Sequence, residues 1–126
     1  AFFGRQVRRH EDDEERSLFP RLAAADPEPD VRALLEHLRR AHEGHRALHE
    51  QLERAVTGRV EGAEADAIAA AGDLFAYLAP LADAIARAYR EHIDEEERTL
   101  FPAARRRLDP DAWLEIQREM DERRGR

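Results

Sequence analysis

The sequence "HEDDEERSLFP", from His10 to Pro20, is almost repeated as "HIDEEERTLFP" from His92 to Pro102. Eight of the eleven positions are identical in the two copies. Each copy places a histidine ahead of a cluster of acidic residues and then closes on Leu-Phe-Pro. A short chain with two copies of such a segment invites the hypothesis that the two segments serve one site.

The composition limits the classes of protein to which the chain can belong. Its 126 residues are about the size of one domain, so we predict a single domain over residues 1–126. The net charge of −7 argues against a nucleic-acid partner, because phosphate binding needs a cationic surface. The chain has no cysteine and no lysine, which excludes disulfides, thiolate catalysis and Schiff-base chemistry. The absence of cysteine makes a reducing cytoplasm the expected location. No apolar run reaches transmembrane length and no signal peptide is visible, so we expect no membrane partner.

Proline and glycine divide the chain into segments rich in Ala, Leu, Arg and Glu, which are strong helix formers. Strand-like alternation is absent, and we predict an all-α, antiparallel up-down bundle with a short C-terminal helix. The predicted helices span residues 2–18, 30–56, 63–104 and 110–123. Asp30 and Asp109 are the expected N-caps of the second and fourth helices, and Pro80 is expected to kink the third.

The predicted helices carry seams of residues spaced three and four apart, and these seams change from apolar to polar along their length. The first seam reads Phe3, Val7, His10, Glu14, Leu18. The second reads Val31, Leu35, Leu38, His42, His45, His49, Leu52, Val56. The third reads Ile68, Ala71, Phe75, Leu78, Ala82, Ile85, Tyr89, His92, Glu96. Five of the six histidines therefore lie where leucines would be expected, and only His37 is predicted to lie on the surface.

Histidines on a seam that faces the core carry a free-energy cost of burial, which some interaction must offset. A buried imidazole without a partner costs about 1–3 kcal/mol, and a buried carboxylate costs more. A metal ion compensates directly, because neutral imidazole and carboxylate are its ligands. The candidate ligands are His10, Glu14, His42, His45, His49, His92 and Glu96. Seven ligands suit two metals better than one, and mixed nitrogen and oxygen donors favour iron, while zinc, manganese or nickel also fit.

Several nearby residues are expected to have other roles. The i, i+4 spacing of a helix puts the chosen glutamates on the face of the histidines, whereas their neighbours point elsewhere. Glu15 and Glu97 are second choices as ligands, and Glu11 and Glu43 are expected to be exposed. Tyr89 is expected to serve core packing rather than redox chemistry.

Together, the motif "HxxxEE(R)xLFP", the segment "AHEGHRALHEQLE" and the second copy "HxxxEE(R)TLFP" resemble the hemerythrin-like, HHE cation-binding domain family. The resemblance covers nearly the whole chain. It implies a four-helix bundle around two non-haem iron ions bridged by carboxylate or oxo groups. Members bind oxygen, sense oxygen or iron, or respond to nitric oxide and peroxide.

The resemblance also suggests roles for individual residues. His10 and Glu14 match the ligands of the family's second helix, and His92 and Glu96 match those of the fourth. The third helix supplies one histidine or an i, i+4 pair: His45 and His49 fit the pair, while the surroundings of His42 fit the single histidine. The family's first helix carries another histidine, which nothing before His10 can supply. Either that helix precedes Ala1, or it has been lost and the three seam histidines compensate, with a partner chain or second copy completing the bundle.

Three functions are compatible with these residues. The first is an iron-based module that binds oxygen or senses oxygen, iron or redox state. The second is an enzyme that acts on peroxide or nitric oxide, or repairs iron centres. The third is a helical interaction module whose site is vestigial or holds zinc. The sequence leaves open whether the protein is an enzyme.

Overall fold

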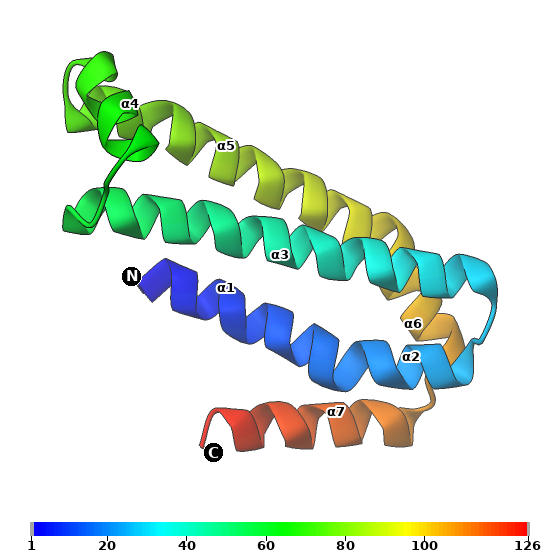
Figure 1. Ribbon diagram of the computed structural model, residues 1–126. Helices are drawn as coiled ribbons and strands as arrows, with labels where there is room; N and C mark the ends of the chain where they lie inside the picture. Colours follow the sequence, from blue (N-terminus) through cyan, green and yellow to red (C-terminus); the bar gives the residue numbers. More distant parts are fainter. Residues whose placement is uncertain (1, 126) are drawn as a thin grey trace.

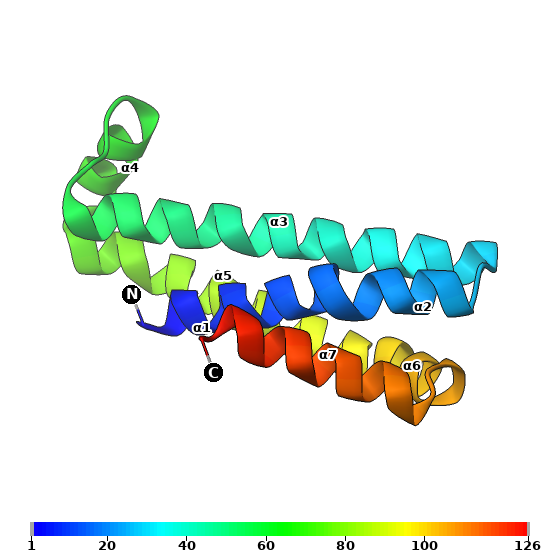
Figure 2. The same cartoon turned by 90° about the horizontal axis from the view of Figure 1, so that it is seen from below.

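The computed structural model describes residues 2–125, with side chains from Arg5 to Gly125, and all regular elements in this range are helical. In chain order they are α1 (Phe2–Asp13), η1 (Glu14–Leu18), α2 (Phe19–Ala25), α3 (Pro29–Thr57), α4 (Ala63–Ala71), α5 (Leu74–Glu95), η2 (Glu96–Leu100), α6 (Phe101–Arg107) and α7 (Pro110–Arg123). The α1–α2, α3 and α5–α6 segments lie side by side, and α7 runs along α1–α2 (Figures 1 and 2). The predicted all-α bundle with a short C-terminal helix is confirmed.

The first helix is longer than predicted, because it continues from α1 through η1 and α2 to Ala25. The sequence prediction ended it at residue 18, ahead of Pro20. Proline has no N–H to donate, and its ring clashes with the carbonyl four residues back. The π-helical turn η1 precedes it, with the Phe19 N–H bonded to the carbonyl of Glu14, five residues back. We infer that this wider turn admits the proline. η2 has the same relation to Pro102, and α6 ends at Arg107 rather than at residue 104.

The predicted third helix is broken near its start. Gly72 adopts φ 100°, a backbone conformation that glycine tolerates far better than other residues, and it ends α4. Asp73 then caps α5 by accepting a hydrogen bond of 2.8 Å from the Ala76 N–H. The bend between α4 and α5–α6 is 108°, whereas α5 continues as a helix through Pro80. The early part of the predicted seam, up to Phe75, therefore does not lie in the core. Phe75 itself is 83% exposed.

The two predicted N-caps have different outcomes. Asp109 caps α7 by accepting a hydrogen bond of 2.8 Å from the Ala112 N–H, as expected. α3 begins at Pro29 with Glu28 as its extended N-cap, so the prediction for Asp30 is wrong. Proline has its φ preset for the first helical turn, which explains the earlier start.

Within residues 2–125, no single helix combines the length and the apolar character needed to cross a membrane. Only the joined pair Ala63–Ala71 and Leu74–Arg107 passes that test, and its two parts are bent by 108°.

The apolar core occupies the end of the bundle where α2, α6 and the start of α3 meet α7 (Figure 1). Its most buried side chains include Leu22, Leu38 and Leu100. Ile116, 5% exposed, brings α7 into this core, while Trp113 lies largely outside it at 38% exposed. From this core the bundle continues toward the histidines, so apolar packing at one end positions the polar side chains in the middle.

An ion pair also holds α7 against α2. The Arg21 guanidinium donates to both carboxylate oxygens of Glu119, at 2.7 and 2.9 Å. This hydrogen bonding lowers the pKa of Glu119 from its ordinary value to about 2.

We expect the Glu119→Gln variant to be about 1 kcal/mol less stable than wild type at pH 7. A carboxylate whose pKa is depressed in the folded state stabilises the fold above its ordinary pKa, and this contribution is lost as the pH falls toward 2. Urea unfolding between pH 7 and pH 2 measures the difference. Glu122→Gln, on an exposed side chain of the same helix, is the control. A difference that does not change with pH would contradict the assignment.

Candidate metal centre

Four buried side chains meet in the middle of the bundle. The two π-helical turns provide the glutamates, α3 provides one histidine and α5 provides the other. They are Glu14, His42, His92 and Glu96, and one donor atom from each lies within 4.8 Å of all the others. The repeated motif thus brings its glutamates to one point from two helices that run parallel to each other, with α3 antiparallel to both (Figure 1).

The spacing of the donor atoms is that of ligands around a shared cation. The Nε2 atoms of His42 and His92 are 3.1 Å apart, and His42 Nε2 is 3.2 Å from Glu14 Oε2. His92 Nε2 is 2.7 Å from Glu96 Oε1. Metal–ligand distances of about 2.0–2.2 Å place neighbouring ligands roughly 3 Å apart. The four residues therefore fit a metal ion.

Several buried polar atoms of this cluster have no hydrogen bond of regular geometry among the described residues. They are both carboxylate oxygens of Glu14, Glu96 Oε2 and His92 Nδ1. A buried polar group left in this state is costly, and a carboxylate more so than a neutral group. A cation that accepts the carboxylate lone pairs would remove most of that cost.

His10 lies at the exposed side of the cluster, with 57% of its side chain accessible. Its Nε2 is 2.6 Å from Glu14 Oε1 and 3.9 Å from Glu96 Oε2. The other oxygen of each carboxylate lies near an inner histidine, His42 for Glu14 and His92 for Glu96. Both carboxylates therefore lie between the outer histidine and the inner pair.

The cluster perturbs the protonation of its members in opposite directions. Burial, reinforced by the neighbouring Glu14 carboxylate, raises the pKa of Glu96 to about 9. Burial would also raise the pKa of Glu14, but contacts with His10 and His42 outweigh it and leave that pKa below its ordinary value. Burial lowers the pKa of His92. Two carboxylates facing each other without a cation thus favour a proton on one of them.

His45 lies beside the cluster and pairs with a residue that the sequence analysis misplaced. Its Nδ1 is 3.2 Å from Glu11 Oε2, and its ring is 4.9 Å from that of His92. Glu11 was expected to be exposed, but only 3% of it is accessible. The sequence analysis assumed one buried seam for this helix. α1 in fact contacts both α3 and α7, so a wider face of the helix is buried and includes Glu11.

Glu15 also contributes, although the sequence made it only a second choice as a ligand. Its Oε1 lies 3.0 Å from His42 Nδ1, the ring nitrogen that faces away from the cluster, and Arg46 holds its other oxygen at 3.1 Å. Carboxylates in this position commonly fix the orientation of a metal-binding imidazole. On the other side, the Phe19 ring stacks on His42 with a centroid distance of 5.9 Å.

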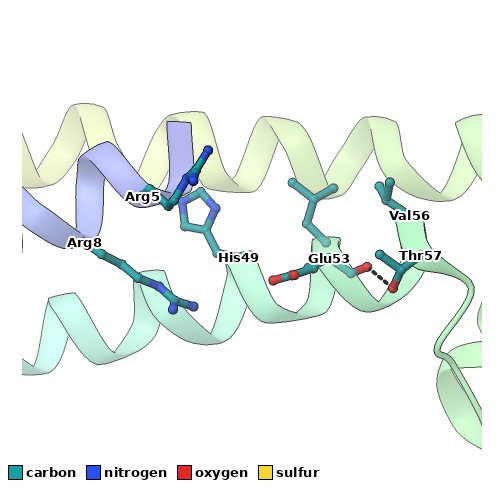
Figure 3. A pocket seen from close by; sticks show the side chains of 7 residues that line it. Arg5, Arg8, His49, Glu53, Val56 and Thr57 are labelled. Carbon is teal, nitrogen blue, oxygen red and sulfur yellow. Dashed lines mark hydrogen bonds between the residues drawn. The ribbon is translucent and has the colours of Figure 1, made fainter. Parts of the chain in front are cut away.

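His49 is separate from the four-residue cluster. Its Nε2 forms a hydrogen bond of 2.6 Å with the Tyr89 hydroxyl, and its ring lines a hollow of about 490 Å³ together with Arg5 and Arg8 (Figure 3). His37 is a surface residue, as predicted, and bonds Glu95 at 3.0 Å. Of the seven predicted ligands, the structure gathers four tightly, places His10 and His45 against them and sets His49 apart.

This fold and this cluster define a helical bundle with a buried histidine–carboxylate site suited to a metal ion. The model of the family described as the Hemerythrin HHE cation binding domain matches residues 1–104, so the chain belongs to that family. Comparisons with curated proteins and with solved structures gave no match. The resemblance inferred from the repeated motif is confirmed, and α7 lies beyond the matched residues.

Proposed function

We propose that the protein binds two non-haem iron ions in this cluster and uses them to bind or sense oxygen. The observation that carries the proposal is the placement of the two carboxylates, each with one oxygen near His10 and the other near an inner histidine. Carboxylates placed in this way suit a bridge between two cations.

The donors divide into two sets. The outer set consists of His10 Nε2, Glu14 Oε1 and Glu96 Oε2. The inner set consists of His42 Nε2, His92 Nε2, Glu14 Oε2 and Glu96 Oε1. Mixed imidazole and carboxylate donors suit iron, and they also accept zinc or manganese. His45 and His49 lie outside both sets, and we give them no role as ligands.

The surroundings suit a small ligand. Bound iron would supply reversible one-electron chemistry and a coordination position for oxygen. The outer set has fewer protein donors and its histidine is exposed, so solvent and a diatomic ligand can reach this side. On the inner side, Phe19 and the apolar core exclude water from His42.

Anaerobic reconstitution with Fe(II), followed by metal analysis by mass spectrometry, tests the proposal. We expect two irons per chain, and near-ultraviolet absorption bands that change when air is admitted. Less than one iron per chain, or tight binding of zinc alone, would contradict it. Turnover of peroxide or nitric oxide by the reconstituted protein would instead favour the enzymatic hypothesis.

A further inference from the structure

Two of the three differences between the repeated motifs change how the π-helical turns are held. In the second copy, Glu95 bonds His37 on the surface, and the Thr99 hydroxyl donates to the carbonyl of Glu95 in its own helix at 2.6 Å. In the first copy, the equivalent Asp13 and Ser17 are buried, with 5% and 0% of each residue accessible. The first copy therefore uses these positions for contacts that the second copy lacks.

The partners of Asp13 and Ser17 are Arg123, the last residue of α7, and Arg124, which follows it. Arg123 donates to Asp13 Oδ1 at 3.1 Å and to the Ser17 hydroxyl at 2.5 Å. Arg124 donates to both carboxylate oxygens of Asp13, at 3.2 and 2.5 Å. Charge-assisted bonds of this kind, made by largely buried groups, are stronger than surface ion pairs.

These contacts hold the turn that carries Glu14. Asp13 immediately precedes η1 and Ser17 lies within it. α7 therefore contacts η1 through residues on both sides of Glu14 in the sequence. Arg21 adds a bond of 3.0 Å to the carbonyl of Ser17 while it pairs with Glu119 of α7. The equivalent residues of the second copy are not held by α7: Glu95 bonds His37 of α3, and Thr99 bonds the carbonyl of Glu95 in its own helix.

We propose that α7 is a clamp that positions Glu14, with Arg123 as the positioning residue. The clamp acts on one carboxylate of the centre only, so release of α7 would loosen Glu14 and leave Glu96 in place. The Fe(II) titration that tests this proposal rests on the proposed function, whereas the hydrogen–deuterium exchange of the metal-free protein does not. α7 lies beyond the residues matched by the family model, so this coupling belongs to this chain's own C-terminal helix.

The repeat provides a matched pair of variants for the test. Ser17→Ala removes the hydroxyl that Arg123 bonds, and Thr99→Ala removes the equivalent hydroxyl of the second copy, which bonds only its own helix. Arg123→Ala removes the clamp itself, and Arg118→Ala, on the exposed face of α7, is its control. All four are made in the full chain.

Hydrogen–deuterium exchange of the metal-free proteins, read by mass spectrometry, is the first measurement. We expect amides of residues 14–18 to exchange about tenfold faster in Arg123→Ala and Ser17→Ala, which corresponds to the loss of one charged hydrogen bond. Residues 96–100 should be unchanged in these two variants, and Thr99→Ala and Arg118→Ala should leave residues 14–18 unchanged. If Arg123→Ala fails to fold, Ser17→Ala decides this measurement.

Anaerobic Fe(II) titration of the same proteins is the second measurement. We expect Ser17→Ala and Arg123→Ala to bind iron about 10–100-fold more weakly than wild type, as is typical when a residue that supports a ligand is removed. Arg123→Lys should restore part of the loss. Unchanged exchange in residues 14–18 would overturn the clamp, and faster exchange with unchanged iron affinity would overturn its positioning role. A wild-type chain that binds no iron would overturn the proposed function, while the exchange difference would still support the clamp.

Discussion

Replacing both Glu14 and Glu96 by glutamine is expected to weaken metal binding by at least about 100-fold without destabilising the metal-free protein. Glutamine keeps the size of the side chain but loses the negative charge that a cation needs. In the metal-free protein, the two carboxylates are buried close to each other, and three of their oxygens, both of Glu14 and Oε2 of Glu96, have no hydrogen bond of regular geometry among the described residues. Their removal should leave the free energy of unfolding unchanged or raise it by up to about 2 kcal/mol.

Iron titration and urea unfolding of the same samples test both parts of this prediction. Glu43→Gln is the matched control, because Glu43 lies on α3 with its carboxylate exposed. This control should bind metal as wild type does. A double variant that still binds iron tightly would exclude Glu14 and Glu96 as the bridging carboxylates. A strongly destabilised metal-free double variant would mean that the contacts with the histidines outweigh the cost of burial.

Adding Fe(II) under anaerobic conditions is expected to raise the melting temperature by roughly 10–20 °C. A ligand at 1,000 times its dissociation constant stabilises the folded state by about 4 kcal/mol when the unfolded chain does not bind it. For a domain of this size, 1 kcal/mol corresponds to a shift of roughly 3–5 °C. The proposed ions would bind side chains from α3, α5 and the two π-helical turns at once, and the unfolded chain cannot offer the same site.

Calorimetry with and without a chelator measures this shift. The chelated protein should return to the lower melting temperature, and the Glu14→Gln/Glu96→Gln variant should show no shift in either condition. An equal shift in this variant would mean that the metal acts elsewhere on the chain. No shift in the wild type would support the interaction-module hypothesis.

The fold class and the centre of the site could be predicted because both follow from helical periodicity. A histidine and a glutamate four residues apart lie on one face of a helix whatever surrounds it. Two such pairs, with three histidines on the seam of the helix between them, predicted seven candidate ligands and left the choice among His42, His45 and His49 open. The four side chains that the structure gathers most closely, Glu14, His42, His92 and Glu96, are among the seven. The apolar ends of the same seams, including Leu35 and Leu38, predicted the bundle core.

The remaining features depend on packing between helices that are distant in the sequence. Glu11 and Asp13 lie off the predicted seam and are buried only because α1 contacts both α3 and α7. His49 is on the seam, yet it lies apart from the cluster and bonds Tyr89 instead.

The sequence by itself determined the all-α fold, the helical seams that carry the histidines and the i, i+4 pairing of His10 with Glu14 and of His92 with Glu96, because these depend on local geometry. The tertiary structure decided which histidines meet, how the carboxylates are oriented and which turn α7 holds. Such contacts depend on the relative placement of whole helices, and residues far apart in the chain do not reveal that placement through their spacing.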